Sequence, residues 1–303
     1  MPKVVQASEV AASFINDIKA KVLTLDKKPT LVGFLANDDP AAKKYAQWTA
    51  KTCAETGIIF ELREVKRTVL EEEIVNANED SNVHGIMVYY PVFGGTQDQY
   101  IQNIVSVAKD VEGLCHKYRY NMYHNIRYLD KEEKNKCIIP CTPLAIVKIL
   151  EYIGVYNMII PFGDRLHGRT ITIINRSEVV GRPLAALLAN DGAKVYSVDE
   201  FGILEFHRKN LKLSKHETAE CDLTLEQALS NSDCVITGVP SPKYQLPSAT
   251  LKDGVILVNF STFKNIGQDA QDKSSIYVPS VGKVTVAMLE RNLTRLYDYL
   301  SQS

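Results

Sequence analysis

The chain has 303 residues, which suits two domains of roughly 150 residues better than a single core. Its 35 basic and 36 acidic residues leave a net charge of −1, which gives no case for a nucleic acid or an anionic membrane as a partner. The apolar content is an ordinary 45%, and no run of about 18 apolar residues occurs, so no membrane span is expected.

The first residues, MPKVVQASEVAASFINDIKAKV, follow the pattern of an amphipathic helix. They have neither the apolar core of a secretory signal nor the Arg-rich pattern of a presequence. The cysteines form no C-x-x-C pair, and no histidine stands at zinc-finger spacing from them, so we expect neither a metal site nor a disulfide framework. These features together predict a cytoplasmic protein with reduced thiols.

The next part of the chain alternates strand and helix patterns, as a parallel α/β sheet requires. Its expected strands are TLVGFLA, IIFELREV and HGIMVYYP, and its later helices are VLEEEIVNANED and QDQYIQNIVSVA. The helix between the first two strands lies within NDDPAAKKYAQWTAKTCAETG. It has Asp39 as its cap, Pro40 at its first position and Gly57 just beyond its end. We expect residues 1–150 to form one domain.

Residues 115–140 are polar, aromatic and irregular, and PCTPLAIVKILEYIGV then begins a helix at a proline turn. The alternation resumes at residue 168, so residues 151–283 are predicted to form a second α/β domain. Its expected strands are TITIIN, AKVYSVDE, DCVITGVP and GVILVNF. The last segment, KVTVAMLERNLTRLYDYLSQ, is predicted to be one long helix with an apolar face.

One stretch, TITIINRSEVVGRPLAALLANDGAKVYSVDE, has the order of a dinucleotide-binding unit but lacks the G-x-G-x-x-G fingerprint. TITIIN is the expected strand, and Pro183 is expected to begin the helix. RSEVVGR then forms the turn at which a pyrophosphate binds a helix N-terminus. In this turn Arg176 and Ser177 can donate to phosphate or ribose, and Gly181 permits a close backbone approach.

Asp199 ends the second strand of this unit, about 20 residues beyond Gly181, where an acid binds the ribose 2′-OH. An acid at this position repels the 2′-phosphate of NADP, so the sequence favours NAD. Arg176 could instead reach a 2′-phosphate, which leaves some use of NADP open. The incomplete glycine pattern also leaves open a strand–helix–strand unit with no ligand.

Several blocks resemble the methylenetetrahydrofolate dehydrogenase/cyclohydrolase family, from about residue 30 to residue 290. NRSEVVGRPLAALLANDGAKV is similar to its G-R-S-x-x-V-G-x-P segment. The blocks GIMVYYPV, KDVEGL, PCTP, ITGVP and VGKVTVAML stand in the family order. The resemblance implies an α/β protein of two parallel-sheet domains flanking a cleft. Residues 1–150, completed by the C-terminal helix 284–303, would bind folate, and residues 151–283 would form a Rossmann-like NAD domain.

The departures from the family pattern are similar to its monofunctional, NAD-dependent branch. Most members combine a dehydrogenase with a cyclohydrolase and carry Tyr-x-x-x-Lys on the first helix. Here Tyr45 keeps the tyrosine, but Thr49 replaces the lysine. Tyr89 replaces a glutamine, and Glu112 replaces an aspartate.

These departures fit the chemistry of one activity only. Oxidation of 5,10-methylenetetrahydrofolate to 5,10-methenyltetrahydrofolate moves a hydride to NAD and mainly requires positioning. Hydrolysis of the methenyl product requires an ionisable group such as the missing lysine, which threonine cannot replace. The resemblance therefore implies an NAD-dependent dehydrogenase without cyclohydrolase activity.

The resemblance also implies residues for each site. Tyr45 and Thr49 share a helix face that we expect to line the folate site, with Cys141 as a candidate thiol near the domain junction. Further substrate contacts are expected from Tyr89, Pro91, Glu112, Val281 and Gly282. Cofactor contacts are expected from Asn175, Arg176, Ser177, Gly181, Asp199, Gly238, Val239, Pro240 and Asn259. Alternatively, Tyr45 is a packed aromatic, Glu112 a solvated acid and Cys141 an inert buried thiol.

The family context implies a homodimer that takes reduced folates, including polyglutamylated ones, in the one-carbon metabolism that serves purine biosynthesis. Two alternatives remain. In one, the protein is bifunctional and Lys44 or Lys51 replaces the missing lysine, although Lys51 points away from the face of Tyr45 and Thr49. In the other, it is a non-catalytic nucleotide-binding relative.

Overall fold

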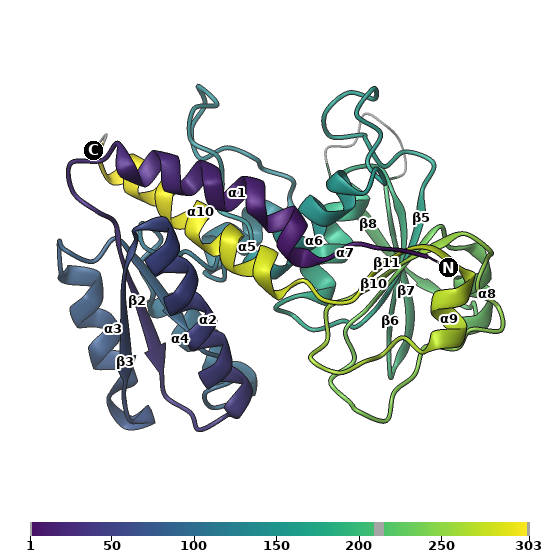
Figure 1. Cartoon of the computed structure of the whole chain (residues 1–303), viewed down its shortest axis with the longest axis horizontal. Coiled ribbons are helices and arrows are strands. Elements are labelled where there is room, and N and C mark those ends of the chain that lie inside the picture. The colour runs from purple at the N-terminus through teal and green to yellow at the C-terminus, as the bar shows by residue number, and fades with distance from the viewer. Residues whose placement is uncertain (1, 209–214, 302–303) are drawn as a thin grey trace. The chain divides into compact units, whose positions relative to one another are not determined.

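The computed structural model of the chain describes residues 2–208 and 215–301, which form two α/β units, each with its own sheet (Figure 1). The large-sheet unit is drawn from residues 1–10, 121–126 and 142–284. The small-sheet unit is drawn from residues 11–120, 127–141 and 285–303. No helix among the described residues is long and apolar enough to cross a membrane.

The small-sheet unit contains three parallel strands in the order β3-β2-β4. The strands are β2 (Thr30–Leu35), β3 (Ile59–Glu64) and β4 (Gly85–Val88). Around them lie α1 (Ala7–Leu23), α2 (Pro40–Thr56), the short η1 (Arg67–Val69), α3 (Leu70–Glu79), α4 (Gly95–Ile104), α5 (His116–Tyr123) and α10 (Gly282–Ser301). α5 lies within the stretch that the sequence predicted to be irregular, so that prediction was wrong there.

The central strand β2 separates two cores, because side chains alternate along a strand. Leu31 and Leu35 pack on one face against α1, α2 and α10. Val32 and Phe34 pack on the other face against α3 and α4. Helices therefore cover both faces of this sheet (Figure 1).

The predicted limits of α2 are confirmed. The Asp39 carboxylate accepts a hydrogen bond from the Ala41 amide at 2.9 Å, and Pro40 is the first helical residue. Gly57 lies beyond the end with φ of +85°, and its amide donates to the Cys53 carbonyl. The helix thus begins and ends where local chemistry satisfies its free amides and carbonyls.

The large-sheet unit has eight strands in the order β1-β11-β10-β9-β5-β6-β7-β8. The strands are β1 (Lys3–Val4), β5 (Thr170–Ile174), β6 (Lys194–Asp199), β7 (Gly202–His207), β8 (Glu217–Cys221), β9 (Cys234–Thr237), β10 (Val255–Asn259) and β11 (Ser274–Val278). The helices are α6 (Cys141–Tyr152), α7 (Gly181–Asn190), α8 (Leu225–Asn231) and α9 (Gln268–Lys273).

This sheet is parallel from β1 to β6, as the sequence predicts, but β7 and β8 continue it in antiparallel order. The chain reverses after β6 in a tight turn, where Asp199 pairs with Gly202 at φ of +128°. The sequence analysis missed this hairpin. β8 is largely exposed, so it lacks the continuous apolar run that marks a buried parallel strand.

Two boundaries differ from the expected ones. The N-terminal residues belong with the large sheet, because β1 pairs with β11 through Lys3 and Ile276. The unit boundary also lies within the first turn of α6, between residues 141 and 142, rather than at residue 150. β1 has only two residues, too few to give a recognisable sequence pattern.

Candidate functional site

The carboxyl ends of β5 and β9 meet at a topological switch point. From β5 the chain moves to β6 on one side, and it later returns to β9 on the other. Asn175 follows β5, and its side-chain amide donates to the Gly238 carbonyl beyond β9 at 2.8 Å. Ligands of open α/β sheets bind in the crevice outside such a point, so this edge is the first place to seek a cofactor site.

The turn between β5 and α7 is tightly built. The prediction that Pro183 begins the helix was wrong, because α7 begins at Gly181 and Pro183 lies within its first turn, where a missing amide is tolerated. A Cβ on Gly181 would lie 1.9 Å from the Asn175 carbonyl oxygen. Gly181 therefore permits a close approach, but to the protein's own backbone. The Ser177 hydroxyl accepts from the amides of Val180 (3.3 Å) and Gly181 (3.4 Å) and keeps its own hydrogen to donate.

The two residues that the sequence analysis linked to the choice of cofactor are paired with each other. Arg176 Nη1 lies 2.9 Å from the Asp199 carboxylate, and the Arg176 side chain is 12% exposed. Its other terminal nitrogen donates to the carbonyls of Ser197 and Gly202, each at 2.6 Å. Burial lowers the pKa of Arg176, and Asp199 opposes this change. The guanidinium is therefore held against the β6–β7 turn rather than extended into solvent.

The segments beyond β9 and β10 are fixed by buried amides. Val239 donates through its backbone amide to Asn265 Oδ1 at 2.8 Å, and its carbonyl accepts from the Ser261 hydroxyl at 2.8 Å. Asn259, which ends β10, is buried and donates to the Phe263 carbonyl at 2.9 Å. Pro240 follows Val239 and is exposed. Sequence reasoning missed Asn265 and Ser261, because nothing in their local pattern indicates contacts with a distant turn.

A second cluster lies in the small-sheet unit, on the face of α2 that the sequence singled out. The rings of Tyr45 and Tyr89 meet edge to face, with centroids 5.8 Å apart. Thr49 is fully buried, and its hydroxyl donates to the Tyr45 carbonyl at 3.0 Å. The Tyr89 hydroxyl is buried with no hydrogen-bond partner among the described residues. Burial raises the pKa of both phenols, so this cluster consists of neutral polar groups.

Glu112 borders the same cluster. Its carboxylate accepts from the Val88 amide at the end of β4 at 3.0 Å, and the residue is half-buried. Burial raises the pKa of Glu112 to about 8, although the Val88 amide opposes the rise. Its loop is shaped by Asp110, whose carboxylate accepts from the amides of Glu112, Gly113 and Cys115. Glu112 is therefore a group held in place, not a freely solvated acid.

Cys141, at the start of α6, contacts this loop as well. Its thiol is buried and donates to the Val111 carbonyl at 3.2 Å. Burial raises the pKa of the thiol, and Glu112 and Asp110 add to the effect. A thiolate is the nucleophilic form of cysteine, so this environment does not support nucleophilic catalysis by Cys141.

Pro91 lies in the turn after β4, at the switch point of the small sheet. Asn37, which follows β2, donates to the carbonyls of Tyr89 (2.7 Å) and Pro91 (2.9 Å) and so ties the two strand ends together. Sequence reasoning missed Asn37. Val281 and Gly282 stand at the start of α10, in the part of the chain that is grouped with the large-sheet unit.

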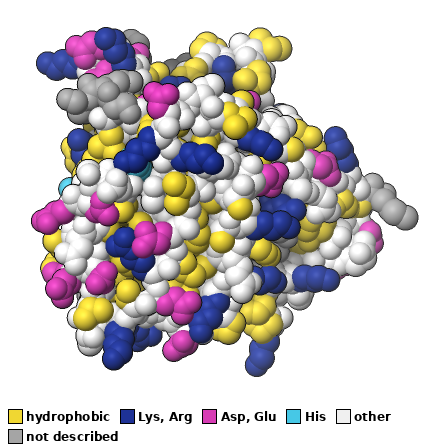
Figure 2. All heavy atoms as spheres, turned by 60° about the vertical axis from the view of Figure 1, so that its left-hand side comes forward, with side chains coloured by type: hydrophobic (Ala, Val, Ile, Leu, Met, Phe, Trp, Pro, Cys, Tyr) yellow, Lys and Arg dark blue, Asp and Glu magenta, His cyan; other side chains and the backbone are white. Residues whose placement is uncertain are grey.

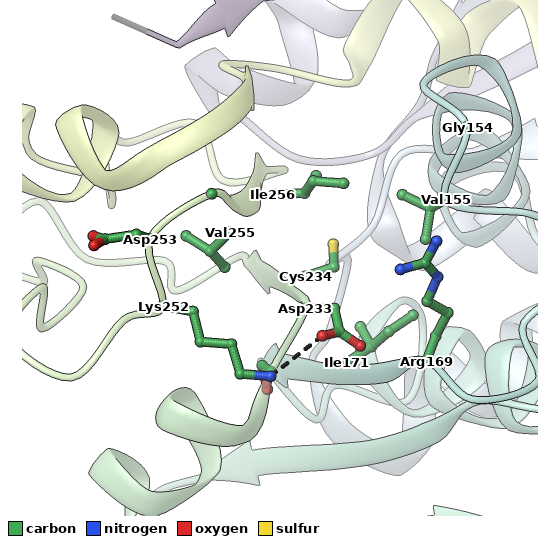
Figure 3. Close-up of a pocket in the computed structure, with 12 residues that line it drawn as sticks. Gly154, Val155, Arg169, Ile171, Asp233, Cys234, Lys252, Asp253, Val255 and Ile256 are labelled. Carbon is green, nitrogen blue, oxygen red and sulfur yellow. Dashed lines mark hydrogen bonds and ion pairs between the residues drawn. The ribbon is translucent and has the colours of Figure 1, made fainter.

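The cavity drawn in Figure 3 is a separate feature, of about 200 Å³. It lies at the amino ends of β5, β9 and β10, whereas Asn175 and Gly238 lie at the carboxyl ends. Its charges are balanced within the protein, since Asp233 pairs with Lys252 at 3.2 Å and accepts from the Thr170 amide at 3.0 Å. It therefore offers no counterpart to the predicted site.

Two models of one protein family together match most of the chain. Residues 5–112 match the tetrahydrofolate dehydrogenase/cyclohydrolase catalytic domain, and residues 140–300 match the NAD(P)-binding domain of the same family. The chain is 57% identical to the NAD(+) methylenetetrahydrofolate dehydrogenase of Schizosaccharomyces pombe, over 98% of this chain and 93% of the relative. It is 49% identical to the Dictyostelium discoideum protein of that name, over 97% of this chain and 94% of the relative.

A solved structure supports the fold. The NAD-dependent 5,10-methylenetetrahydrofolate dehydrogenase of Saccharomyces cerevisiae aligns with a TM-score of 0.95 and 51% identity, covering 100% of this chain and 99% of that one. A dehydrogenase-cyclohydrolase of Trypanosoma brucei aligns with a TM-score of 0.79 at 20% identity, which supports the fold alone.

Proposed function

Because the chain belongs to the tetrahydrofolate dehydrogenase/cyclohydrolase family, we propose that it oxidises 5,10-methylenetetrahydrofolate to 5,10-methenyltetrahydrofolate with NAD, and that it lacks cyclohydrolase activity. The dehydrogenase activity is inferred from one observation. The chain is 49–57% identical in sequence, over nearly its whole length, to relatives named for this NAD-dependent reaction. The reaction belongs to one-carbon folate metabolism.

The large-sheet unit supplies the residues that would hold NAD, which accepts the hydride when bound. Ser177 has a hydroxyl hydrogen to donate beside the start of α7, where the helix dipole favours a pyrophosphate. Asp199 ends β6, where it would bind the ribose 2′-OH. Gly238, Val239, Pro240 and Asn259 would border the cofactor from the ends of β9 and β10.

NAD rather than NADP follows from the pairing of Arg176. A 2′-phosphate beside Asp199 would be repelled by the Asp199 carboxylate. The Arg176 guanidinium, which could neutralise the phosphate, already pairs with that carboxylate at 2.9 Å. To bind the phosphate, Arg176 would have to leave Asp199 and its two carbonyl partners. Arg176 therefore supports NAD specificity, although the sequence also allowed it a role in binding NADP.

The small-sheet unit would bind the folate. Tyr45 and Tyr89 form an edge-to-face pair that can receive a flat pterin ring, and Glu112 can hydrogen-bond to ring nitrogens. With a raised pKa near 8, the Glu112 carboxyl can donate as well as accept at neutral pH. Pro91 would line the same strand end, and Val281 and Gly282 would contact the substrate from the start of α10. None of these groups needs to transfer a proton for hydride removal.

The loss of cyclohydrolase activity rests on Thr49. Its hydroxyl is committed to the Tyr45 carbonyl, and it has no charge with which to activate water. Lys44 is exposed and lies over the Trp48 ring, 5.2 Å from its centroid, and Lys51 is exposed as well. Neither lysine is placed in the buried cluster around Thr49, which weighs against the bifunctional alternative.

Beyond the reaction itself, we propose that the protein acts in the cytoplasm as a homodimer and accepts polyglutamylated folates. Its one-carbon product would then serve purine biosynthesis. These proposals rest on the family context. Size-exclusion chromatography with light scattering tests the dimer, and KM values for mono- and pentaglutamylated substrate test the tail preference.

The test of function is an initial-rate assay with 5,10-methylenetetrahydrofolate and either NAD or NADP, following methenyl product and reduced cofactor together. We expect turnover with NAD and one-for-one accumulation of methenyltetrahydrofolate and NADH. A preference for NADP would refute the role given to Asp199. Methenyl loss faster than in buffer would establish a cyclohydrolase, and no turnover with either cofactor would favour the non-catalytic alternative.

A further inference from the structure

The centre of the small-sheet unit contains a buried amide with no role in the sites described so far. Asn292 lies on α10 and is fully buried. Its side-chain nitrogen donates to the carbonyls of Val111 at 2.9 Å and Ile139 at 3.0 Å. The same nitrogen lies 3.6 Å from the Cys141 thiol. One side chain therefore joins two loops that are distant in the sequence.

The two bonds determine the orientation of this amide. An oxygen in place of the nitrogen would face two carbonyl oxygens, and three acceptors cannot bond to one another. Asn292 Oδ1 is left buried with no hydrogen-bond partner among the described residues. A buried unsatisfied acceptor costs free energy, so this arrangement is stable only because both donor bonds are made.

One of the two loops carries Glu112, a residue of the folate site proposed above. Val111 directly precedes Glu112, and its carbonyl also accepts from the Cys141 thiol. Gly113, at φ of +68°, packs so closely that a Cβ there would lie 2.9 Å from the backbone of Ile139 and Pro140. The position of the Glu112 carboxyl therefore depends on contact between the two loops.

We propose that Asn292 is a positioning residue for the folate site: it fastens the Glu112 loop to the loop before Cys141 and so fixes the carboxyl that meets the pterin. This inference rests on the proposed function for the identity of the ligand. Asn292 itself touches neither substrate nor cofactor. Its loss should therefore weaken reduced-folate binding and leave NAD binding unchanged.

The test compares Asn292→Ala and Asn292→Asp with the wild type. The ligand is 5-formyltetrahydrofolate, a reduced folate that needs no turnover, and its binding is measured by calorimetry. We expect Kd for this folate to rise about tenfold in Asn292→Ala, the effect of losing hydrogen bonds worth ~1.4 kcal/mol. Kd for NAD should change less than twofold. Thr294→Val is the matched control, because Thr294 is buried on the same helix and its hydroxyl donates to the Arg291 carbonyl at 2.9 Å.

The aspartate variant separates positioning from general loss of structure. Its carboxyl can donate one hydrogen bond when protonated and none when ionised. Folate affinity in Asn292→Asp should therefore recover as the pH falls, by at least threefold more than in the wild type. A lowered unfolding temperature with unchanged folate affinity in both variants would overturn the proposal. Wild-type protein that binds 5-formyltetrahydrofolate but turns nothing over would refute the proposed reaction and leave the Asn292 inference testable.

Discussion

At the scale of single residues, the cluster of Tyr45, Thr49 and Tyr89, which we propose binds folate, consists of neutral groups. Burial raises the pKa of Tyr45 and Tyr89, and Thr49 has no ionisable group. A desolvated ammonium at position 49 would gain an opposite charge only when Glu112 is ionised, and Glu112 is about half protonated near pH 8. The cluster is therefore consistent with binding and orienting a folate rather than activating water.

Tyr45→Phe tests the orienting role. The substitution keeps the ring that packs edge to face on Tyr89 and removes only the hydroxyl. We expect KM for methylenetetrahydrofolate to rise about three- to tenfold, the value of one hydrogen bond, with KM for NAD unchanged. Tyr152→Phe, at an exposed position on α6, serves as the control. Unchanged kinetics in Tyr45→Phe would refute the orienting role and leave Tyr45 with a packing role alone.

Glu290 makes stability depend on pH. It is fully buried on α10, close to the Thr56 hydroxyl and the Cys53 thiol. Burial raises its pKa to about 7, with Thr56 and Cys53 opposing the rise. The folded protein therefore binds a proton that the unfolded chain releases near pH 4.5, so stability falls as pH rises from about 4.5 to 7.

We predict that Glu290→Leu stabilises the protein at pH 8 by roughly 3 kcal/mol and has little effect near pH 4.5. Leucine fits the surroundings, since Leu289 and Leu293 of α10 pack in the same core. Urea unfolding of both proteins, followed by the fluorescence of the single tryptophan, Trp48, measures the difference. An equal change at both pH values would show that packing, not ionisation, is responsible.

At the scale of elements, the β6–β7 turn links cofactor choice to local structure. We predict that Asp199→Ser lowers kcat/KM with NAD at least tenfold, because the ribose loses its acceptor. It should raise kcat/KM with NADP about tenfold, because the repelling charge is gone and Arg176 loses its counter-ion. Glu200→Ser, at the adjacent exposed acid, is the control and should change neither value. A loss with NAD and no gain with NADP would mean that the other bonds of Arg176 hold it in place.

The elements that the sequence predicted well are those fixed by local chemistry. Asp39 and Gly57 limit α2 through contacts within a few residues, so their pattern can be read directly. Asn292 could not be identified in this way, because its partners lie at Val111 and Ile139 and only the folded chain brings them together. For the same reason the sequence gives Arg176 and Asp199 competing roles, whereas the fold pairs the two side chains.

At the scale of the whole molecule, the 35 basic and 36 acidic residues of the sequence nearly balance. On the face in Figure 2, basic and acidic side chains are interspersed. Recognition of an anionic substrate must then depend on the placed groups of the site rather than on a long-range field. We therefore expect the KM for monoglutamylated substrate to vary little with salt between about 50 and 200 mM. A KM that rises steeply with salt would show that a long-range field attracts the substrate.

The two units should nevertheless respond together when a ligand binds one of them. Among the described residues four helices, α1, α5, α6 and α10, cross a unit boundary without a break, so neither unit can unfold without disturbing an element of the other. NAD at 100 times its Kd adds about 2.7 kcal/mol of stability to the folded state. For a unit of this size we predict a rise in unfolding temperature of about 5–10 °C. Trp48, in the small-sheet unit, should report the same rise as calorimetry. The opposite result would be a Trp48 unfolding temperature that NAD does not change, together with a second calorimetric transition that NAD raises. It would mean that the helices unwind at the boundary and that the units unfold independently.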